Sequence, residues 1–198
     1  MTTVQETKSV TDTVTVENAA ILELLEGTST HSSKDKGLYA LNSVQLEGPG
    51  DGHLIARATD RYRLIEGEIE GEGSLTPSLI SLEDTKRVIA LVKGSKLSRV
   101  SFNRIGDLLT VSVTGSSITV QILDANYPDF TTILDKIGRE GDPIELSFNP
   151  ALFADYAKIA GKGNAVRVGF TGEGKPMVIH LPETSVKWYA LLMPMRVI

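Results

Sequence analysis

The sequence predicts an α+β protein in which one short unit of strands and a helix is used three times. In each copy a strand leads into an amphipathic helix, and three more strands follow at a nearly constant spacing. Repetition at a fixed period indicates units that close on their neighbours, with the helices on one side of antiparallel sheets. Hydrophobic residues make up 41% of the chain and charged residues 23%, which is enough for a buried core.

The first unit follows a polar stretch, residues 1–12, which has no periodicity and is expected to be a flexible tail. Alternation predicts a strand at 13–16, and Asn18 is the expected cap of a helix that ends near Gly27. The strands that complete the unit are expected at 38–47, 53–58 and 63–69.

The second unit opens with a strand at 78–82. Ser81 and Asp84 have the spacing of a capping box, and Gly94 is the expected end of the helix. Its last strands are expected at 99–103, 108–114 and 117–124.

The third unit starts with a strand at 144–148. Asn149 is the expected helix cap, Pro150 takes the first helical position, and Gly161 ends the helix. Strands should follow at 166–170, 177–181 and 186–193. We therefore expect one complete two-unit domain at 13–137 and a half-domain at 143–198.

Composition excludes several classes of protein. A net charge of −5 argues against a simple basic nucleic-acid coat, although basic side chains could still gather on one face. With no cysteine, the chain has no disulfide, no thiolate zinc site and no cysteine nucleophile. No apolar run has the length of a membrane span and the N-terminus is not signal-like, so a soluble, cytoplasmic protein is expected.

Catalysis has little support in the sequence. His31, His53 and His180 have no ligand spacing, so solvated or core histidines are expected and no metal site. The stretches 71–73 and 172–174 are turns that open no helix, so no phosphate loop is expected. We expect neither a cofactor nor an enzyme.

Three short motifs carry a resemblance. Residues 58–64, Ala-Thr-Asp-Arg-Tyr-Arg-Leu, resemble the Ala-Thr-Asp-Gly-His-Arg-Leu signature in the middle domain of bacterial sliding clamps, the DNA polymerase III beta subunit. Residues 126–130, Asn-Tyr-Pro-Asp-Phe, are similar to the signature that ends that domain, and 193–197, Met-Pro-Met-Arg-Val, to the family's C-terminus. Family members have six such units, so this resembles a shortened member, of a size that suits a compact viral genome.

The resemblance implies a processivity factor of DNA replication: a ring that encircles duplex DNA without reading its sequence and tethers a polymerase. A clamp loader and the polymerase would bind through short linear motifs. In the family twelve units close the ring, so three units per chain imply a homotetramer by arithmetic, or a dimer as half a ring. Two copies of 143–198 would complete each other across a two-fold axis.

The resemblance also implies that basic side chains on the helices face the DNA. The candidates are Lys86, Arg87, Lys93, Lys96, Lys158 and Lys162. The alternative is that lysines near helix C-termini only complement the helix dipole. The first helix is an exception, because Glu17, Glu23 and Glu26 are acidic and no cation accompanies them.

A groove for partner peptides is the second implied site. By motif it would be lined by Leu41, Thr59, Arg61, Tyr62, Arg63, Leu64, Pro128, Thr132, Ile133, Leu191, Leu192, Met193, Pro194, Met195 and Arg196. Its apolar walls would take Leu or Phe anchors, with Arg63 and Arg196 at the rim. Arg61-Tyr62 and Thr132 depart from the family signature, so the preferred peptide is expected to differ.

Plainer alternatives exist for each motif. Thr59 and Asp60 could bond the local backbone at a hairpin end, 127–129 could be a turn, and the C-terminal strand could simply complete a core. The rival function is an adaptor or decoy derived from a clamp, which keeps the groove but never encircles DNA.

Overall fold

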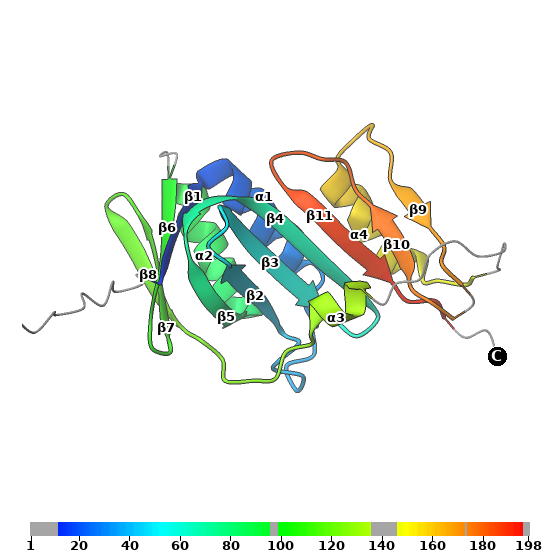
Figure 1. Cartoon of the computed structure of the whole chain (residues 1–198), viewed down its shortest axis with the longest axis horizontal. Coiled ribbons are helices and arrows are strands. Elements are labelled where there is room, and N and C mark those ends of the chain that lie inside the picture. Colours follow the sequence, from blue (N-terminus) through cyan, green and yellow to red (C-terminus); the bar gives the residue numbers. More distant parts are fainter. Residues whose placement is uncertain (1–11, 96–98, 136–145, 173, 196–198) are drawn as a thin grey trace, which may run out of the picture.

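The computed structural model describes residues 12–95, 99–135, 146–172 and 174–195 (Figure 1). The first repeat contains β1 (Thr13–Glu17), α1 (Asn18–Ser29), β2 (Ser43–Gly48), β3 (His53–Thr59) and β4 (Arg63–Gly73). The second contains β5 (Leu75–Ser81), α2 (Leu82–Gly94), β6 (Arg99–Ile105), β7 (Leu108–Val113) and β8 (Ser116–Gln121). The remainder contains α3 (Phe130–Asp135), α4 (Pro150–Ala160), β9 (Arg167–Gly169), β10 (Met177–His180) and β11 (Lys187–Leu192).

The first two repeats are interleaved rather than side by side. β1 pairs with β6, where Val16 lies opposite Val100, and β2 pairs with β5, where Val44 lies opposite Ile80. Each repeat therefore supplies a strand to the other, and the valines and isoleucines that alternate along these strands fill one shared core. The two repeats cannot separate without breaking both pairings.

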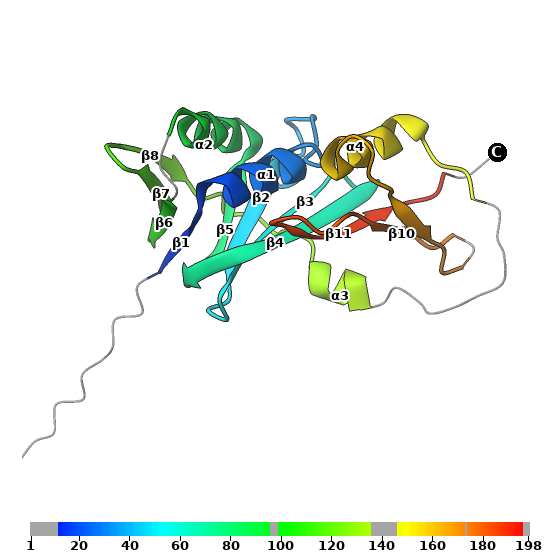
Figure 2. The same ribbon diagram turned by 90° about the horizontal axis from the view of Figure 1, so that it is seen from above.

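The third repeat continues the same sheet. β11 pairs antiparallel with β4 from Lys187–Glu68 to Leu192–Arg63, and β10 and β9 extend the sheet beyond it. Figure 2 shows α1, α2 and α4 on one face of the strands and the short α3 on the other. Among the described residues, no helix combines the length and apolar character needed to cross a membrane.

Two glycines let the third repeat approach the first closely. A Cβ at Gly67 of β4 would lie 2.6 Å from Cζ3 of Trp188, and one at Gly27 of α1 would lie 2.5 Å from its Cη2. Contacts that short do not occur between real side chains, so the indole of β11 fits only because both positions lack a side chain. The junction between β4, α1 and β11 is consequently tightly packed.

Two of the three predicted helix caps are confirmed. The Ser81 hydroxyl accepts a hydrogen bond from the Asp84 amide at 3.0 Å, and Asn149 accepts one from the Ala151 amide at 2.9 Å. The prediction for Asn18 is wrong, because Asn18 is already helical and Glu17 is the capping position. The Asn18 side chain instead donates to the Val92 carbonyl of α2 at 3.2 Å.

Two predicted strands need correction. The strand expected at 38–47 begins only at Ser43, because the amides of Leu41 and Asn42 close a turn on the Leu38 carbonyl. The strand expected at 144–148 is absent from its described part, where Ser147 makes a single bridge to Met195. In the first two repeats the leading strand pairs with a strand of the other repeat, and the third repeat has no such neighbour in the described chain.

The other predicted strands are confirmed within a few residues, and α3 was not predicted. The predicted tail at 1–12 falls almost wholly outside the described residues. The predicted domain boundary, residues 137–143, also lies outside them, so the division into a domain and a half-domain stays a prediction.

Candidate functional site

A cavity of about 350 Å³ opens where the β3–β4 hairpin, α3 and the end of β11 meet. It is lined by Leu41, Thr59, Arg61, Arg63, Leu64, Pro128, Phe130, Ile133, Pro176, Leu191 and Met193, and we call it the groove. All of these except Phe130 and Pro176 are among the residues expected there from the sequence. The structure therefore brings together segments that are far apart along the chain.

The inner wall of the groove is a small apolar cluster. Leu64, Phe130 and Leu191 are buried against one another, because β4 and β11 place the two leucines opposite each other in register. The rings of Phe130 and Tyr127 stack with their centroids 5.8 Å apart. Since these side chains are already held by the sheet and by α3, a peptide anchor would meet a preformed surface.

The mouth of the groove is shaped by the β3–β4 turn. The Thr59 hydroxyl donates to the Arg63 carbonyl at 2.7 Å, and the Asp60 carboxylate accepts the amides of Tyr62 and Arg63 at 3.1 and 3.2 Å. The side chains of Thr59 and Asp60 thus bond the local backbone, as the plainer alternative for this motif expected. Thr59 also lines the cavity.

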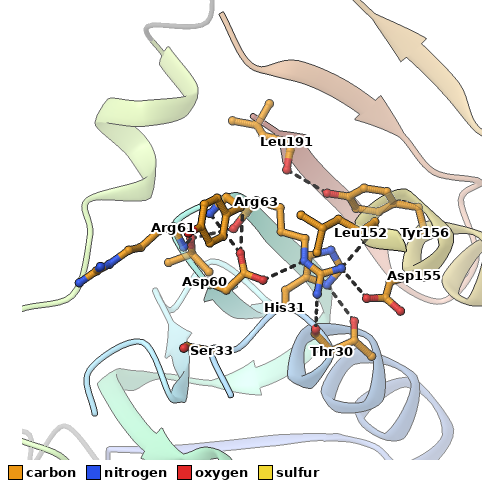
Figure 3. Close-up of polar contacts among 12 residues, drawn as sticks. Thr30, His31, Ser33, Asp60, Arg61, Arg63, Leu152, Asp155, Tyr156 and Leu191 are labelled. Atoms are coloured by element: carbon orange, nitrogen blue, oxygen red, sulfur yellow. Dashed lines mark hydrogen bonds and ion pairs between the residues drawn. The ribbon is translucent and has the colours of Figure 1, made fainter. Parts of the chain in front are cut away.

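Arg61 in this turn has a backbone φ of 80°, a region that favours glycine. No hydrogen bond or ion pair of its guanidinium group occurs among the described residues. Figure 3 shows the side chain extending away from the buried polar groups beside it. It is an exposed cation at the mouth of a mostly apolar cavity.

Arg63 does not lie at the rim, as the sequence suggested, because its side chain is only 5% exposed. Its guanidinium pairs with Asp60 at 3.0 Å and with Asp155 of α4. It also donates to the carbonyls of Thr30 at 2.9 Å and Leu152 at 3.1 Å (Figure 3). One buried arginine therefore joins the hairpin to the end of α1 and to α4, and these bonds use four of its five N–H donors.

The same junction holds a buried histidine. His31 lies with its ring centroid 5.1 Å from that of Tyr156, and its Nδ1 is 2.9 Å from the Thr30 hydroxyl. Burial, followed by the charge of Arg63, lowers the pKa of His31 to about 3, so the ring is neutral. In the part of the chain that the structure describes, no cluster of His, Asp and Glu side chains could hold a metal ion.

Several residues expected in the groove lie elsewhere. Leu192 is fully buried in the main core, and Tyr62 is 65% exposed outside the cavity. Thr132 bonds Asp129 at the start of α3, and Met195 forms the bridge to Ser147. Pro194 does not line the cavity, and Arg196 is outside the described residues. Phe130 belongs to the 126–130 motif and could have been included, whereas Pro176 precedes β10 with no signal in the sequence.

The helix face carries most of the basic candidates. Lys86 and Arg87 are exposed on α2, Lys158 on α4, and Lys162 just after it. Arg87 pairs with Asp84 at 2.7 Å and Lys158 with Asp155 at 2.6 Å, and both cations keep more than half of their surface in solvent. Lys96 lies outside the described residues.

The acidic side chains of α1 have partners inside the protein. Glu26 pairs with Lys93 of α2 at 2.5 Å, so that candidate lysine already faces a carboxylate. Glu23 accepts hydrogen bonds from Thr184 and Ser185 in the loop before β11. Much of the negative charge of α1 is therefore neutralised or bonded locally.

Solved structures match this arrangement over nearly the whole chain. The DNA polymerase III beta subunit of Thermotoga maritima matches with a TM-score of 0.83 at 17% identity, covering 100% of this chain and 69% of that one. The sliding clamp of Caulobacter crescentus matches with a TM-score of 0.80 at 16% identity, covering 98% of this chain and 68% of that one. The chain has the sliding-clamp fold.

A Pseudomonas aeruginosa sliding clamp with a bound ligand matches equally, with a TM-score of 0.82 at 16% identity over 100% of this chain and 69% of that one. No protein-family model matches the sequence, and neither does any curated protein. The predicted α+β clamp fold is confirmed, in a shortened form that spans about two thirds of these bacterial clamps.

Proposed function

We propose that this protein is a DNA sliding clamp: a homo-oligomer that encircles duplex DNA and holds a replicative polymerase through the groove. The observation that carries this proposal is the helix layer, in which α1, α2 and α4 lie together on one face of a continuous sheet (Figure 2). A helix layer of this kind can line a hole while the sheet forms the outer wall. Such a protein would act by holding a polymerase on DNA, not by catalysis.

Charge supports the placement of DNA on the helix face. Lys86, Arg87, Lys158 and Lys162 are exposed there in a protein whose net charge is −5. Lysine and arginine contacts to phosphates are independent of sequence, as a moving ring requires, and they weaken as salt is raised.

The third repeat supports assembly with further copies. Phe170 is 50% exposed and Phe148 is 37% exposed, and a second cavity of about 400 Å³ lies among β9, β10 and β11. In the first two repeats the leading strands are covered by the other repeat, since β1 pairs with β6 and β5 pairs with β2. A second copy of residues 143–198 would cover the exposed phenylalanines of the third repeat across a two-fold axis.

The groove supports binding of a linear motif. Its inner wall of Leu64, Phe130 and Leu191 suits Leu or Phe anchors. Arg61 holds a costly backbone conformation at the mouth, and strain of this kind collects at functional sites. A bound peptide would place a carboxylate beside its guanidinium, in place of a partner from the chain itself.

The test is retention on DNA that has no ends. Dilute chains are reassembled in the presence of a nicked circular plasmid, the complex is washed at high salt, and half of it is then cut once with a restriction enzyme. We expect the protein to remain on the circle and to leave the linear DNA. A topological link survives salt, whereas phosphate contacts do not. Equal loss from both forms would contradict encirclement.

An adaptor or decoy is the second candidate, and one observation favours it. Every residue that lines the groove comes from a single chain, so motif binding needs no ring. A decoy would bind motif peptides as tightly as a clamp does, yet its retention would not depend on whether the DNA is circular. The molar mass from light scattering separates the two candidate functions, since a ring requires an oligomer and a decoy does not.

A further inference from the structure

The second cavity, of about 400 Å³, lies on the face of the sheet that carries α3, opposite the helix layer (Figure 2). Leu191 packs against Phe130 of α3, and strand alternation and register carry the same face along β11 and across β10 to β9. The side chains that share this face and line the cavity are Arg167, Val178, His180, Lys187, Tyr189 and Leu191. Phe148 and Phe170, the residues proposed to contact a second copy, do not line it.

The second cavity adjoins the groove. Leu191 lines both, and Val178 packs against the cluster of Leu64, Phe130 and Leu191 that forms the inner wall of the groove. β10 and β9 lie one and two strands beyond β11. Neighbouring strands are about 4.8 Å apart and an extended residue spans about 3.3 Å, so a peptide that continues for a few residues past the groove reaches the second cavity.

Arg167 brings an exposed positive charge to this cavity. No ion pair of its guanidinium occurs in the part of the chain that the structure describes, and its cross-strand neighbour in β10 is His180, not a carboxylate. Apart from Arg61, each of the other described arginines pairs with a carboxylate. Among the described arginines, the two without such a partner therefore line the groove and the cavity beside it.

Lys187 is the second cation of the cavity. Its Nζ lies 5.7 Å from the ring centroid of Tyr189, so the ammonium group stands over an aromatic face. Glu68 lies opposite Lys187 in the β4–β11 register and Glu183 also lines the cavity, so part of the lysine's charge is balanced within the protein. Arg167 is therefore the main candidate for pairing with a carboxylate of another molecule, which a guanidinium binds in a bidentate geometry.

We propose that the second cavity binds acidic residues that flank the Leu and Phe anchors in the linear motif of a protein partner. The inference rests on the proposed function, because the same partner peptide fills the groove. Charge selects an acidic flank, since a basic one would face Arg167 and Lys187. The apolar floor that the cavity shares with the groove at Leu191 favours a peptide over a nucleic acid.

The test compares fluorescein-labelled peptides by anisotropy, with the full chain as the binding protein. One peptide has neighbouring Leu and Phe anchors alone, a second carries four aspartates before or after the anchors, and a third carries asparagines in their place. In one of the two orders, the aspartate peptide should bind roughly threefold or more tightly than the asparagine peptide, as a few exposed charge pairs provide. This gain should shrink as salt is raised.

Arg167→Glu should remove the gain from aspartate and leave the anchor-only peptide unchanged. A peptide with lysines in place of the aspartates should then bind this variant more tightly than it binds the wild type, which also shows that the variant is folded. The matched control is Arg99→Glu, which makes the same change on β6 at a residue that is 51% exposed and lines neither cavity. This control should keep the full gain from aspartate.

The outcomes separate this inference from the proposed function. Equal binding of the aspartate and asparagine peptides, with the anchors bound, would overturn the second cavity and leave the groove in place. A gain that depends on Arg167 without binding of the anchor-only peptide would keep the cavity and contradict the groove, and no binding of any peptide would contradict both. If Arg167→Glu weakens only the binding of a single-stranded oligonucleotide, the cavity serves nucleic acid and the proposal is wrong.

Discussion

Arg61 and Arg63 stand two residues apart in one motif, and the fold gives them opposite roles. Arg61 extends into solvent at the mouth of the groove from a strained backbone position. Arg63 is buried and bonded to four partners, among them Asp60 and Asp155. Side-chain type cannot distinguish them, because the difference lies in which way the hairpin turns each Cβ.

The methionines at the end of β11 offer a residue-scale prediction. Met193 lines the groove and is 40% exposed, whereas Met195 is 55% exposed and does not line it. Met193→Lys should weaken binding of a labelled peptide with neighbouring Leu and Phe anchors by roughly tenfold or more, since about 1.4 kcal/mol suffices for that factor. Fluorescence anisotropy would measure it.

Met195→Lys is the matched control, because it adds the same charge two residues away. Its affinity for the peptide should stay close to that of the wild type. If the two variants weakened binding equally, the effect would come from charge in general, and the cavity would not be the binding site.

At the scale of elements, the hairpin is fastened to α4 by a buried ion pair. Asp155 accepts from Arg63 on its buried side and from Lys158 on its exposed side. Partial burial alone would raise the pKa of Asp155, but the hydrogen bonds from Lys158 and Arg63 outweigh it and hold the pKa below its usual value. The carboxylate is therefore ionised at neutral pH.

Asp155→Ala should be far more costly than Lys158→Ala. Removing the Asp155 carboxylate leaves the buried Arg63 guanidinium with Asp60 alone of these two carboxylate partners. Loss of a hydrogen bond to a charged group typically costs roughly 1.5 to 3 kcal/mol. Lys158 is 71% exposed, and loss of such a surface pair costs about 0 to 1 kcal/mol. Urea unfolding of both variants would check this. Equal destabilisation would mean that Arg63 does not depend on α4.

Acid sensitivity is a prediction for the whole molecule. His31 is fully buried, and its pKa falls from 6.5 to about 3 in the folded state. Between these values only the unfolded chain takes up the proton, so stability is complete above pH 6.5 and declines as the pH falls below it. The slope is roughly 1.4 kcal/mol per pH unit.

Urea midpoints between pH 7.5 and pH 5 would measure this decline. This pH window stays above the range in which protonation of Asp155 would change the stability. The pKa of that carboxyl group is lowered, so it takes up a proton only in stronger acid. His31→Gln should remove most of the slope, because glutamine does not titrate. An unchanged slope in this variant would assign the acid sensitivity to other groups.

Local patterns were sufficient for much of the fold. The Ser81 and Asn149 caps, the strand alternation and the threefold repeat follow from bonds and periodicities within one stretch of chain. The prediction from local patterns failed where contact with a distant element determined the local structure. Asn18 bonds the Val92 carbonyl of α2 instead of capping its own helix. Residues 146–148 form no strand, because within the described residues no other repeat pairs with them.

The amino-acid sequence by itself determined the repeating unit, the fold class and most of the segments that meet at the groove, because these depend on hydrophobic periodicity and short motifs. Only the tertiary structure decided that Arg63 is buried, that Phe130 and Pro176 line the groove, and that β8 ends the sheet. Burial and strand partnership depend on which distant surfaces come together, and no local pattern records that.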